Sequence, residues 1–502
     1  MVERRHVWVP SDDESPCAVT DLAPSAGTLT MARLGTTGRA AATYLTLAGL
    51  QRGVSLLILP FITHVMSPEE YGAASMLTAA SLMLTAIVAA PLTQLIIRAA
   101  ARGEANGPAL LRVAGTYCYF ALPISVALIA LAVALFVPEL LGVAGYIWGI
   151  ELLAIGLQPA LSTFALWVAQ AREDLPRFVC LSLTSILVGA ASKLLLVVFL
   201  QMGVLGWVIT DLFSAAFSAV LAMSLVRLPR ARVISNDVRY TLKFTLPLIP
   251  HSASLWALTC LSRPAMASVS TLDQVGLLSF GLNLAMVAGL ILAETNRAVL
   301  PRYSRESSPA PTRETFGPVR WQLIAAFVVP AIVGCGVAIT GRWLFAAAYW
   351  PSFALTGVLL IGQTAYGLYL IPMNYLTQTA GLPKYSALAS GAGAALILVS
   401  ILMLGHRYGA FGVSYAIAAG YLTMAAVAMI LTHVLKLDIA WTSWIANWPE
   451  AVLGAAALTF SVAALASPMD SSLGWTFTGA CLVLVLGAIT LTARRSTADV
   501  GS

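Results

Sequence analysis

Charged side chains are scarce in this sequence: Asp, Glu, Lys and Arg make up only 10% of its 502 residues, against about 25% in a soluble domain. Hydrophobic residues make up 59% and the mean hydropathy is +0.86, so polar groups are too few to coat a water-facing surface. Long apolar stretches recur along nearly the whole chain, which excludes a soluble enzyme with a single anchor. We expect an integral membrane protein with most of its mass in lipid.

Motifs for nucleotide hydrolysis and metal catalysis are missing as well. The sequence has no GxxxxGK[ST] and no HExxH, and its five His residues lack metal-ligand spacing. No long extramembrane segment offers room for a catalytic domain, so we expect neither an enzyme nor a bound cofactor or metal. An enzyme with an intramembrane site stays open as an alternative. Transport driven by a gradient, with a proton or a sodium ion as the coupling ion, is the economical interpretation.

The sequence also lacks a disulfide framework and a secretory signal. Its six cysteines (17, 118, 180, 260, 335 and 481) have no pairing spacing, and five lie in apolar stretches, where Cys behaves as a small hydrophobe. Residues 1–39 contain no short apolar core with a cleavage site, and we expect a disordered cytosolic tail there. The net charge is +6, and the basic residues lie between apolar stretches. There they set the orientation in the membrane, and nucleic acid is excluded as a partner.

The apolar stretches predict an all-α protein with about fourteen transmembrane helices, because about 20 apolar residues cross the hydrocarbon core. The predicted spans are 40–66, 72–97, 109–137, 146–169, 178–200, 203–226, 244–270, 275–300, 321–340, 353–378, 385–405, 409–434, 448–467 and 474–493. With these spans, 22 of the 28 Lys and Arg residues fall on one side of the membrane and only Arg342 and Arg407 on the other. This bias predicts that both termini lie in the cytosol. We expect the membrane to be a plasma membrane of the bacterial type.

The sequence repeats itself at a shift of 204 to 207 residues. The matched landmarks are Pro60 and Pro264, Gly72 and Gly276, Arg98 and Arg302, Pro123 and Pro330, Leu175-Pro176 and Leu382-Pro383, and Gly203-x-x-Gly206 and Gly409-x-x-Gly412. Each half therefore holds six helices, and six is even, so both halves have the same orientation. Taken singly, these Pro and Gly residues indicate no more than kinks and close packing. Together they predict two parallel, pseudo-symmetric six-helix lobes that enclose a cavity.

The predicted domain boundaries follow from the spans and the repeat. We expect a tail at 1–39, an N-lobe at 40–226, a basic cytosolic linker at 227–243, a C-lobe at 244–434, two additional helices within 435–493, and a cytosolic tail at 494–502.

Seven ionisable residues inside the predicted spans are candidates for a function, because each costs roughly 2.5–3.5 kcal/mol near the bilayer centre and should face a wet cavity or a partner. They are Arg52, Lys193, Arg263, Arg297, Glu151, Asp211 and Glu294. The repeat shift carries Arg52 onto Trp256 and Arg263 back onto Leu59. These charges are thus not duplicated with the scaffold, as expected if they serve a substrate or a coupling ion.

Arg52, Arg263 and Lys193 are the predicted substrate-binding cations. Two guanidinium groups and an ammonium in one cavity would favour an anion, and phosphate suits the forked guanidinium best. Lys193 has an alternative, because its stem could extend to the outer membrane surface. Arg52 and Arg263 have no comparable alternative.

The remaining intramembrane charges serve either ion coupling or charge pairing. Asp211 would neutralise one of the cations or carry a proton or a sodium ion. Glu151 lies near the expected outer mouth and could be merely interfacial. Glu294 and Arg297 are three residues apart on one helix face, which predicts an ion pair within the helix.

The stretch RGVSLLILPFITHVMSPEEYGAASM, from Arg52 to Met76, resembles the first two helices of the polysaccharide flippases, of the O-antigen type, in the multidrug/oligosaccharidyl-lipid/polysaccharide exporter superfamily. Its apolar helix ends in Pro and a Ser-Pro-Glu-Glu-Tyr-Gly turn follows. Residues 245–268 and Leu300-Pro301-Arg302-Tyr303 are similar to the second half of that family. The likeness covers most of residues 40–434, and the SPEEYG turn is its most specific part.

Two positions depart from the family pattern. Ser262-Arg263 stands where many relatives have Asp-Arg, so the cation is kept and the acid is lost, and ion coupling through that acid is in doubt. His64 stands where relatives usually carry Arg, which weakens one cation at the outer mouth.

The resemblance implies a flippase that moves a polyprenyl-diphosphate-linked oligosaccharide from the cytosolic to the outer leaflet by alternating access, for synthesis of a cell-surface polysaccharide. Arg52 and Arg263 would then bind the diphosphate while the polyprenyl tail stays in the bilayer. Glycosyltransferases or a polysaccharide polymerase would be its protein partners. A multidrug extruder of the same superfamily, a flippase for a peptidoglycan precursor and a non-transporting scaffold for glycan-synthesis enzymes remain alternatives.

Overall fold

The computed structural model describes residues 43, 46–47, 49–51, 53–101, 106–249, 256, 260–305, 313–437, 448–467 and 471–500. The chain divides into two units, Met1–Leu50 and Gln51–Ser502, and the helices below belong to the second. The predicted tail at 1–39 and the side chain of Arg52 lie outside the described residues.

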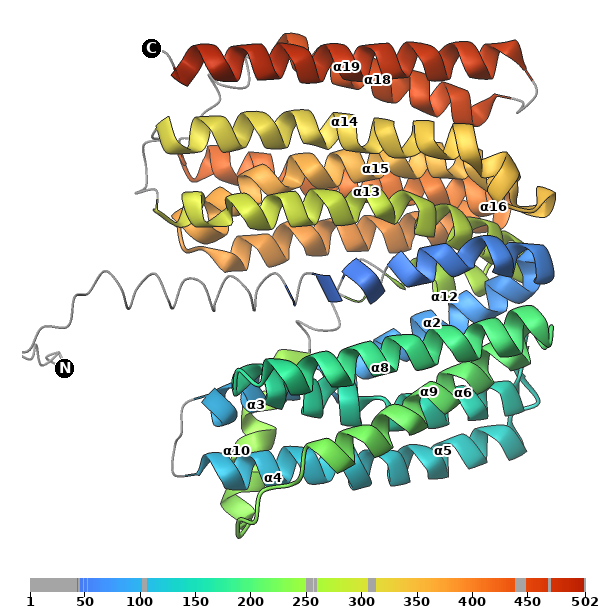
Figure 1. Ribbon diagram of the computed structural model, residues 1–502, viewed down its shortest axis with the longest axis vertical. Helices are drawn as coiled ribbons and strands as arrows, with labels where there is room; N and C mark the ends of the chain where they lie inside the picture. The colour runs from blue at the N-terminus through green and yellow to red at the C-terminus, as the bar shows by residue number, and fades with distance from the viewer. Residues whose placement is uncertain are drawn as a thin grey trace, which may run out of the picture. The chain divides into compact units, whose positions relative to one another are not determined.

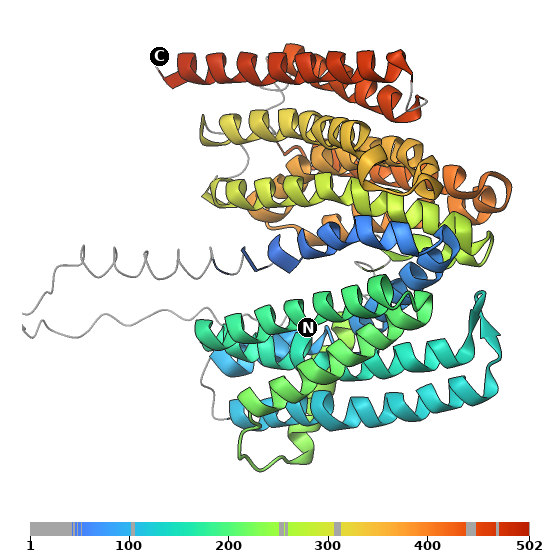
Figure 2. The same cartoon turned by 45° about the vertical axis from the view of Figure 1, so that its right-hand side comes forward.

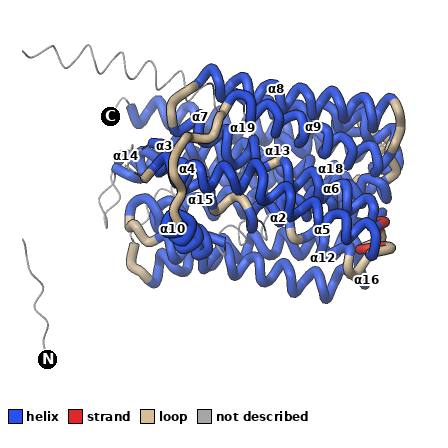
Figure 3. The backbone as a smooth tube through the Cα atoms, turned by 90° about the horizontal axis from the view of Figure 1, so that it is seen from below, coloured by secondary structure: helices blue, strands red, loops and turns tan. Residues whose placement is uncertain are grey.

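The described chain is almost entirely helical, as Figures 1 and 3 show. Up to the middle of the chain its α-helices are α2 (Pro68–Val88), α3 (Leu92–Ala101), α4 (Gly107–Thr116), α5 (Leu122–Phe136), α6 (Gly145–Leu157), α7 (Leu166–Ala171), α8 (Leu175–Lys193), α9 (Gly203–Leu225) and α10 (Ser235–Thr245). Beyond it they are α12 (Ser262–Ala267), α13 (Leu272–Arg305), α14 (Arg313–Leu344), α15 (Pro351–Asn374), α16 (Pro383–Val434), α18 (Trp448–Ala466) and α19 (Ser472–Val500). Residues 53–65, which precede α2, are helical too.

Six short helical segments of other types interrupt or join these helices. Four are π-helical, namely η1 (Tyr117–Ala121), η2 (Ala160–Ala165), η3 (Leu194–Phe199) and η6 (Tyr375–Thr379), and two are 3₁₀, namely η4 (Leu246–Leu248) and η5 (Ala347–Tyr349). Pro123 follows η1 and Pro159 precedes η2, where a missing backbone donor favours a wider helical turn.

Two short strands form the described sheet, an antiparallel hairpin between α5 and α6. Strand β1 (Glu139–Leu140) pairs with β2 (Val143–Ala144), with Glu139 opposite Ala144. The turn residues Leu141 and Gly142 have φ values of 53° and 78°, as a two-residue hairpin with a right-handed twist requires.

Eleven of the described helical stretches are long and apolar enough to span a membrane. One of them, α16, has 52 residues and is broken by non-helical backbone at Gly409, with φ 53° and ψ −138°. Because about 20 residues suffice for one crossing, α16 accounts for the two predicted spans 385–405 and 409–434. The predicted spans 40–66 and 244–270 fall partly on residues that are not described. The expectation of an all-α protein with many membrane spans is confirmed.

Sequence signals explain where α2 begins. Ser67 caps it, because the Ser67 hydroxyl accepts the Glu70 backbone N–H (3.2 Å) and the Glu70 carboxylate accepts the Ser67 N–H (3.0 Å). Pro68 occupies the first helical position, where its missing donor costs nothing. The SPEEYG turn of the sequence is thus a capping box, and its Tyr71 and Gly72 lie inside the helix.

The helices pack in two sets of contacts. Helices α3, α4, α7, α8 and α9, with η1 and η2, share a buried cluster that includes Leu95, Cys118, Phe164 and Leu181. The C-terminal helices (α13–α19) share a second cluster, and α2 joins it through packing on α13. Figure 2 shows α18 and α19 beside α14 within this second set. The predicted lobe and linker boundaries stay predictions.

Candidate functional site

The closest approach between α2 and α13 is a contact of bare backbone at two glycines. A Cβ on Gly72 would overlap the carbonyl oxygen of Leu272, and a Cβ on Gly276 would overlap that of Pro68. These four residues obey one shift of 204, since Pro68 corresponds to Leu272 and Gly72 to Gly276. Small residues let helix backbones meet in this way, so the predicted landmark glycines face each other across a pseudo-twofold contact.

A second pair of contacts follows the same repeat. Gly203 and Gly409 both have positive φ values, 56° and 53°, which only glycine adopts easily. A Cβ on Gly203 would overlap the carboxylate of Glu70, and one on Gly409 would come within 2.6 Å of the Gln274 amide oxygen. Glu70 and Gln274 are again 204 apart. The repeat therefore describes contacts as well as sequence.

Arg263 is buried beside the contact between α2 and α13, with 8% of its surface exposed. Its Nη2 donates a long hydrogen bond to Asn283 Oδ1 (3.4 Å), and its Nε has no hydrogen-bond partner among the described atoms. Asn283 Nδ2 in turn donates to the Tyr71 hydroxyl (2.6 Å). The guanidinium therefore has a neutral amide as its hydrogen-bond partner, and its charge stays uncancelled by that contact.

Aromatic rings continue this chain toward α9. The Tyr71 ring packs edge-on against Trp207, with centroids 6.1 Å apart, and against Tyr349 at 5.9 Å. The buried Tyr349 hydroxyl donates to the Met66 carbonyl (3.0 Å), and burial raises the pKa of Tyr349. The Trp207 ring lies under the Lys193 ammonium, 3.5 Å from its nitrogen. Arg263 and Lys193 are thus joined through Asn283, Tyr71 and Trp207.

Lys193, Asp211 and Glu151 come together among the N-terminal helices. Lys193 Nζ lies 3.9 Å from Asp211 Oδ1, and both side chains are partly exposed. Glu151 is 2% exposed, accepts a hydrogen bond from the Ser81 hydroxyl and has an unpartnered Oε2 among the described atoms. It lies within electrostatic range of both other groups. Glu151 is therefore enclosed by protein, whatever its depth in the membrane.

The structure alters the expected role of Lys193. Its charge is engaged by the Asp211 carboxylate and the Trp207 ring, a partly desolvated arrangement in which cation–π contacts are strongest. Lys193 is therefore less able than Arg263 to serve as a free cation for an anionic ligand.

Glu294 and Arg297 form the predicted ion pair within α13, with Nη1 and Oε1 2.7 Å apart. The Arg297 side chain is 68% exposed. The pair neutralises both charges within one helix, so neither residue requires a substrate as its partner. The role of Arg52 stays a prediction.

Two buried polar groups were not predicted as sites from the sequence. One is an amide cluster in which Asn296 Oδ1 accepts hydrogen bonds from Gln322 Nε2 (2.6 Å) and Asn374 Nδ2 (2.7 Å), and the Tyr303 hydroxyl donates to Gln322 Oε1 (2.5 Å). A search for charged residues misses neutral amides. The signal in the sequence was the presence of an Asn or a Gln inside each of three apolar spans.

The other unpredicted group is an ion pair between Arg320 on α14 and Glu450 on α18, with Nη2 and Oε1 3.3 Å apart. Arg320 is 8% exposed and Glu450 is fully buried. Arg320 counts among the cations of the predicted cytosolic side, and the structure shows it buried between two helices. No cluster of three or more His, Cys, Asp or Glu that could hold a metal occurs in the described ranges.

Comparison with known proteins places this arrangement. The family described as polysaccharide biosynthesis protein matches residues 38–306, more than half of the chain. Among solved structures, the lipid II flippase MurJ in an inward closed conformation is 12% identical, with a TM-score of 0.66 over 91% of this chain and 99% of that chain. An inward-facing multidrug resistance MATE family transporter of the MOP superfamily is also 12% identical, with a TM-score of 0.56 over 78% of this chain and 94% of that chain.

No curated protein sequence matches the chain significantly. At 12% identity the two structures show the fold alone, which is that of multi-pass membrane transporters and flippases.

Proposed function

The chain belongs to the polysaccharide biosynthesis protein family, and on that premise we propose that it is a flippase for a polyprenyl-diphosphate-linked oligosaccharide. The family match confirms the resemblance found in the sequence between Arg52 and Met76. The direction of movement is from the cytosolic to the outer leaflet, in the plasma membrane of a bacterial-type cell, with both termini in the cytosol.

The observation that carries this proposal is the uncancelled charge of Arg263. A buried arginine in a membrane-spanning chain is costly unless it has a task or a partner, and the hydrogen-bond partner of Arg263 is the neutral Asn283. A guanidinium presents parallel donors that match two oxygens of a phosphate group. Arg263 is thus suited to a diphosphate that arrives beside α2 and α13, with Arg52 as the proposed second cation.

The group of Lys193, Asp211 and Glu151 is assigned the coupling step. The Asp211 carboxylate lies 3.9 Å from the Lys193 ammonium and both act electrostatically on Glu151, so the group would exchange a proton or bind a sodium ion at lower cost than an isolated acid. Glu294 and Arg297 are left out of the mechanism because they pair with each other and the Arg297 side chain is exposed.

The glycine contact between α2 and α13 supports movement by alternating access. Two backbone segments related by the repeat, 68–72 and 272–276, meet there without intervening side chains, which allows one set of helices to rotate against the other without unpacking a side-chain interface. Glycosyltransferases or a polysaccharide polymerase would deliver and consume the substrate.

The test compares Arg263→Ala with Arg297→Ala in cells that depend on this protein for surface glycan. We expect Arg263→Ala to stop export and to raise the lipid-linked glycan on the cytosolic leaflet, at unchanged protein abundance. Arg297→Ala should export normally, since its charge serves only the pair with Glu294. Normal export by Arg263→Ala would overturn the assignment.

Two rival functions give different outcomes in the same cells. A multidrug extruder, whose fold this chain shares, would leave the lipid-linked glycan unchanged on deletion of the gene and would alter drug tolerance instead. A scaffold that recruits glycan-synthesis enzymes would be indifferent to Arg263→Ala and would fail only when cytosolic segments are changed.

A further inference from the structure

A cavity of about 400 Å³ lies where α7 ends, α8 begins and α9 ends. Its lining mixes basic and apolar side chains: Val168, Ala169, Arg172, Asp174, Arg177, Ser224, Leu225, Val226 and Arg227. The volume falls in the range of sites for small ligands, about 300–1,000 Å³. None of these residues takes part in the chain of contacts around Arg263, so the cavity forms a second site, here named the basic pocket.

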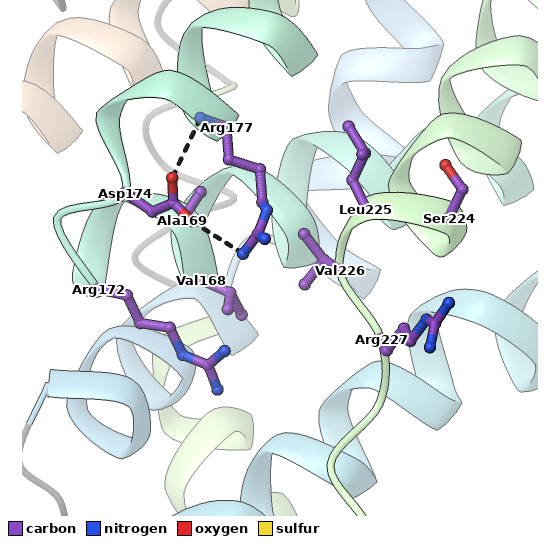
Figure 4. A pocket seen from close by; sticks show the side chains of 9 residues that line it. All are labelled: Val168, Ala169, Arg172, Asp174, Arg177, Ser224, Leu225, Val226 and Arg227. Atoms are coloured by element: carbon purple, nitrogen blue, oxygen red, sulfur yellow. Dashed lines mark hydrogen bonds and ion pairs between the residues drawn. The ribbon is translucent and has the colours of Figure 1, made fainter.

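Two of the three arginines in the basic pocket are not engaged. Asp174 holds Arg177 in an ion pair (2.8 Å), and its carboxylate also accepts the Arg177 backbone N–H (3.2 Å) at the start of α8 (Figure 4). The side chains of Arg172 and Arg227 make no hydrogen bond or ion pair with any described residue, and Arg172 bonds only through its backbone N–H, to the Val168 carbonyl (3.1 Å). Their guanidinium donors therefore remain available to a ligand.

The partial charges of the neighbouring helix ends neutralise only part of the positive charge of the three arginines. Arg172 and Arg227 follow the C-terminal ends of α7 and α9, where a helix dipole of roughly −0.5 charge favours a cation. The start of α8 contributes about +0.5 in the opposite sense. With three arginines and one aspartate, the pocket keeps a net charge of roughly +1.5 after these helix ends are counted. This excess of positive charge favours an anionic ligand.

The position of the basic pocket relative to the membrane indicates which anion it binds. Three candidate membrane spans, Gly145–Ala171, Leu175–Phe199 and Gly203–Leu225, begin or end at its lining residues or one residue away from them. The ends of spans lie at the level of lipid headgroups. The apolar part of the lining, Val168, Leu225 and Val226, suits the glycerol and first acyl carbons next to a headgroup.

We propose that the basic pocket binds the phosphate headgroup of an anionic phospholipid, with Arg172 and Arg227 as the charged donors. Basic pockets between helices at a membrane surface recognise such headgroups, and charged donors make the strongest hydrogen bonds to phosphate oxygens. The site is independent of the flippase function proposed above.

The test measures lipid binding to the full-length protein in detergent by native mass spectrometry, with dioleoylphosphatidylglycerol as the probe and dioleoylphosphatidylcholine as the zwitterionic comparison. The variant R172Q/R227Q should weaken binding of phosphatidylglycerol about 30-fold, the effect of removing two basic groups at a lipid surface. The matched control R230Q/R232Q removes the same charge from two exposed arginines that follow Arg227 and do not line the pocket, and it should bind like the native protein.

A second variant guards against a change in folding. Ser224→Trp fills the basic pocket and keeps every charge, and it should weaken phosphatidylglycerol binding as well. Equal binding by R172Q/R227Q and the native protein, or equal loss in R230Q/R232Q, would overturn the proposal. So would equal affinity for phosphatidylcholine. Displacement of phosphatidylglycerol by millimolar inorganic phosphate would assign the pocket to a soluble phosphate and would overturn the lipid as its occupant.

Discussion

Asn283 on α13 donates a hydrogen bond of 2.6 Å to the hydroxyl of Tyr71 on α2. The two residues are 212 positions apart, and this bond joins helices from opposite halves of the repeat. The same Asn283 accepts from Arg263, so the orientation of the buried guanidinium depends on a contact between the halves.

Replacing Tyr71 by Phe should destabilise the protein. The hydroxyl is lost while the Asn283 amide stays at a half-buried position, and an unpaired polar group costs about 1–3 kcal/mol. The free energy of unfolding in detergent measures the effect. Tyr240→Phe removes a hydroxyl from an exposed tyrosine and should leave that free energy unchanged.

Adding one methyl group at Gly276 should be more damaging. In Gly276→Ala the new Cβ overlaps the backbone carbonyl of Pro68, and backbone cannot move aside as a flexible side chain can, so we expect a loss of about 3 kcal/mol or more in the free energy of unfolding. Gly391→Ala, at a helical glycine with no atom within 4 Å of the added methyl, is the matched control and should be neutral. A well-folded, active Gly276→Ala protein would contradict the close contact.

Breaking the buried pair of Arg320 and Glu450 should separate α14 from α18. Glu450→Gln leaves a buried guanidinium without its carboxylate, at an expected cost of about 3–5 kcal/mol. The double variant Arg320→Met with Glu450→Leu removes both charges and should regain most of that loss. Thermal unfolding of the two variants side by side checks the prediction, and a double variant as unstable as Glu450→Gln would refute it.

Lys193 and Asp211 should respond unequally to the loss of their partners. Lys193→Met leaves the Asp211 carboxylate unpaired beside the buried Glu151, whereas Asp211→Asn leaves Lys193 on the Trp207 ring. We expect Lys193→Met to lower the free energy of unfolding by about 1–2 kcal/mol more than Asp211→Asn. The double variant completes the cycle and should be more stable than Lys193→Met alone. Equal losses in the two single variants would show that the ring contributes nothing.

Much of the fold could be predicted from the sequence because long apolar stretches identify membrane helices. The repeat added more, since the shift that relates Gly72 to Gly276 also relates the contacts those residues make. Charge within apolar stretches singled out Arg263 and the Lys193 group, and both proved to have specific partners. These features depend on local composition or on an internal symmetry, and both are visible in one chain.

The partners of those residues could not be predicted. Asn283 carries no charge, and nothing in the sequence indicates that it lies between Arg263 and Tyr71. Arg172 and Arg227 read as ordinary cations at the cytosolic ends of spans, and only the meeting of three helix ends turns them into a pocket. Which side chains meet across helices depends on helix rotation, and the even apolarity of a membrane span does not fix that rotation.

A chain built from two similar halves might be supposed to tolerate damage to either one. The contact of Gly72 with Gly276 removes that tolerance, because the two copies of the glycine touch each other. An intact partner cannot substitute for a damaged one when the two must touch. Each copy of the duplicated glycine therefore depends on the other, and we expect that neither position accepts any residue other than glycine.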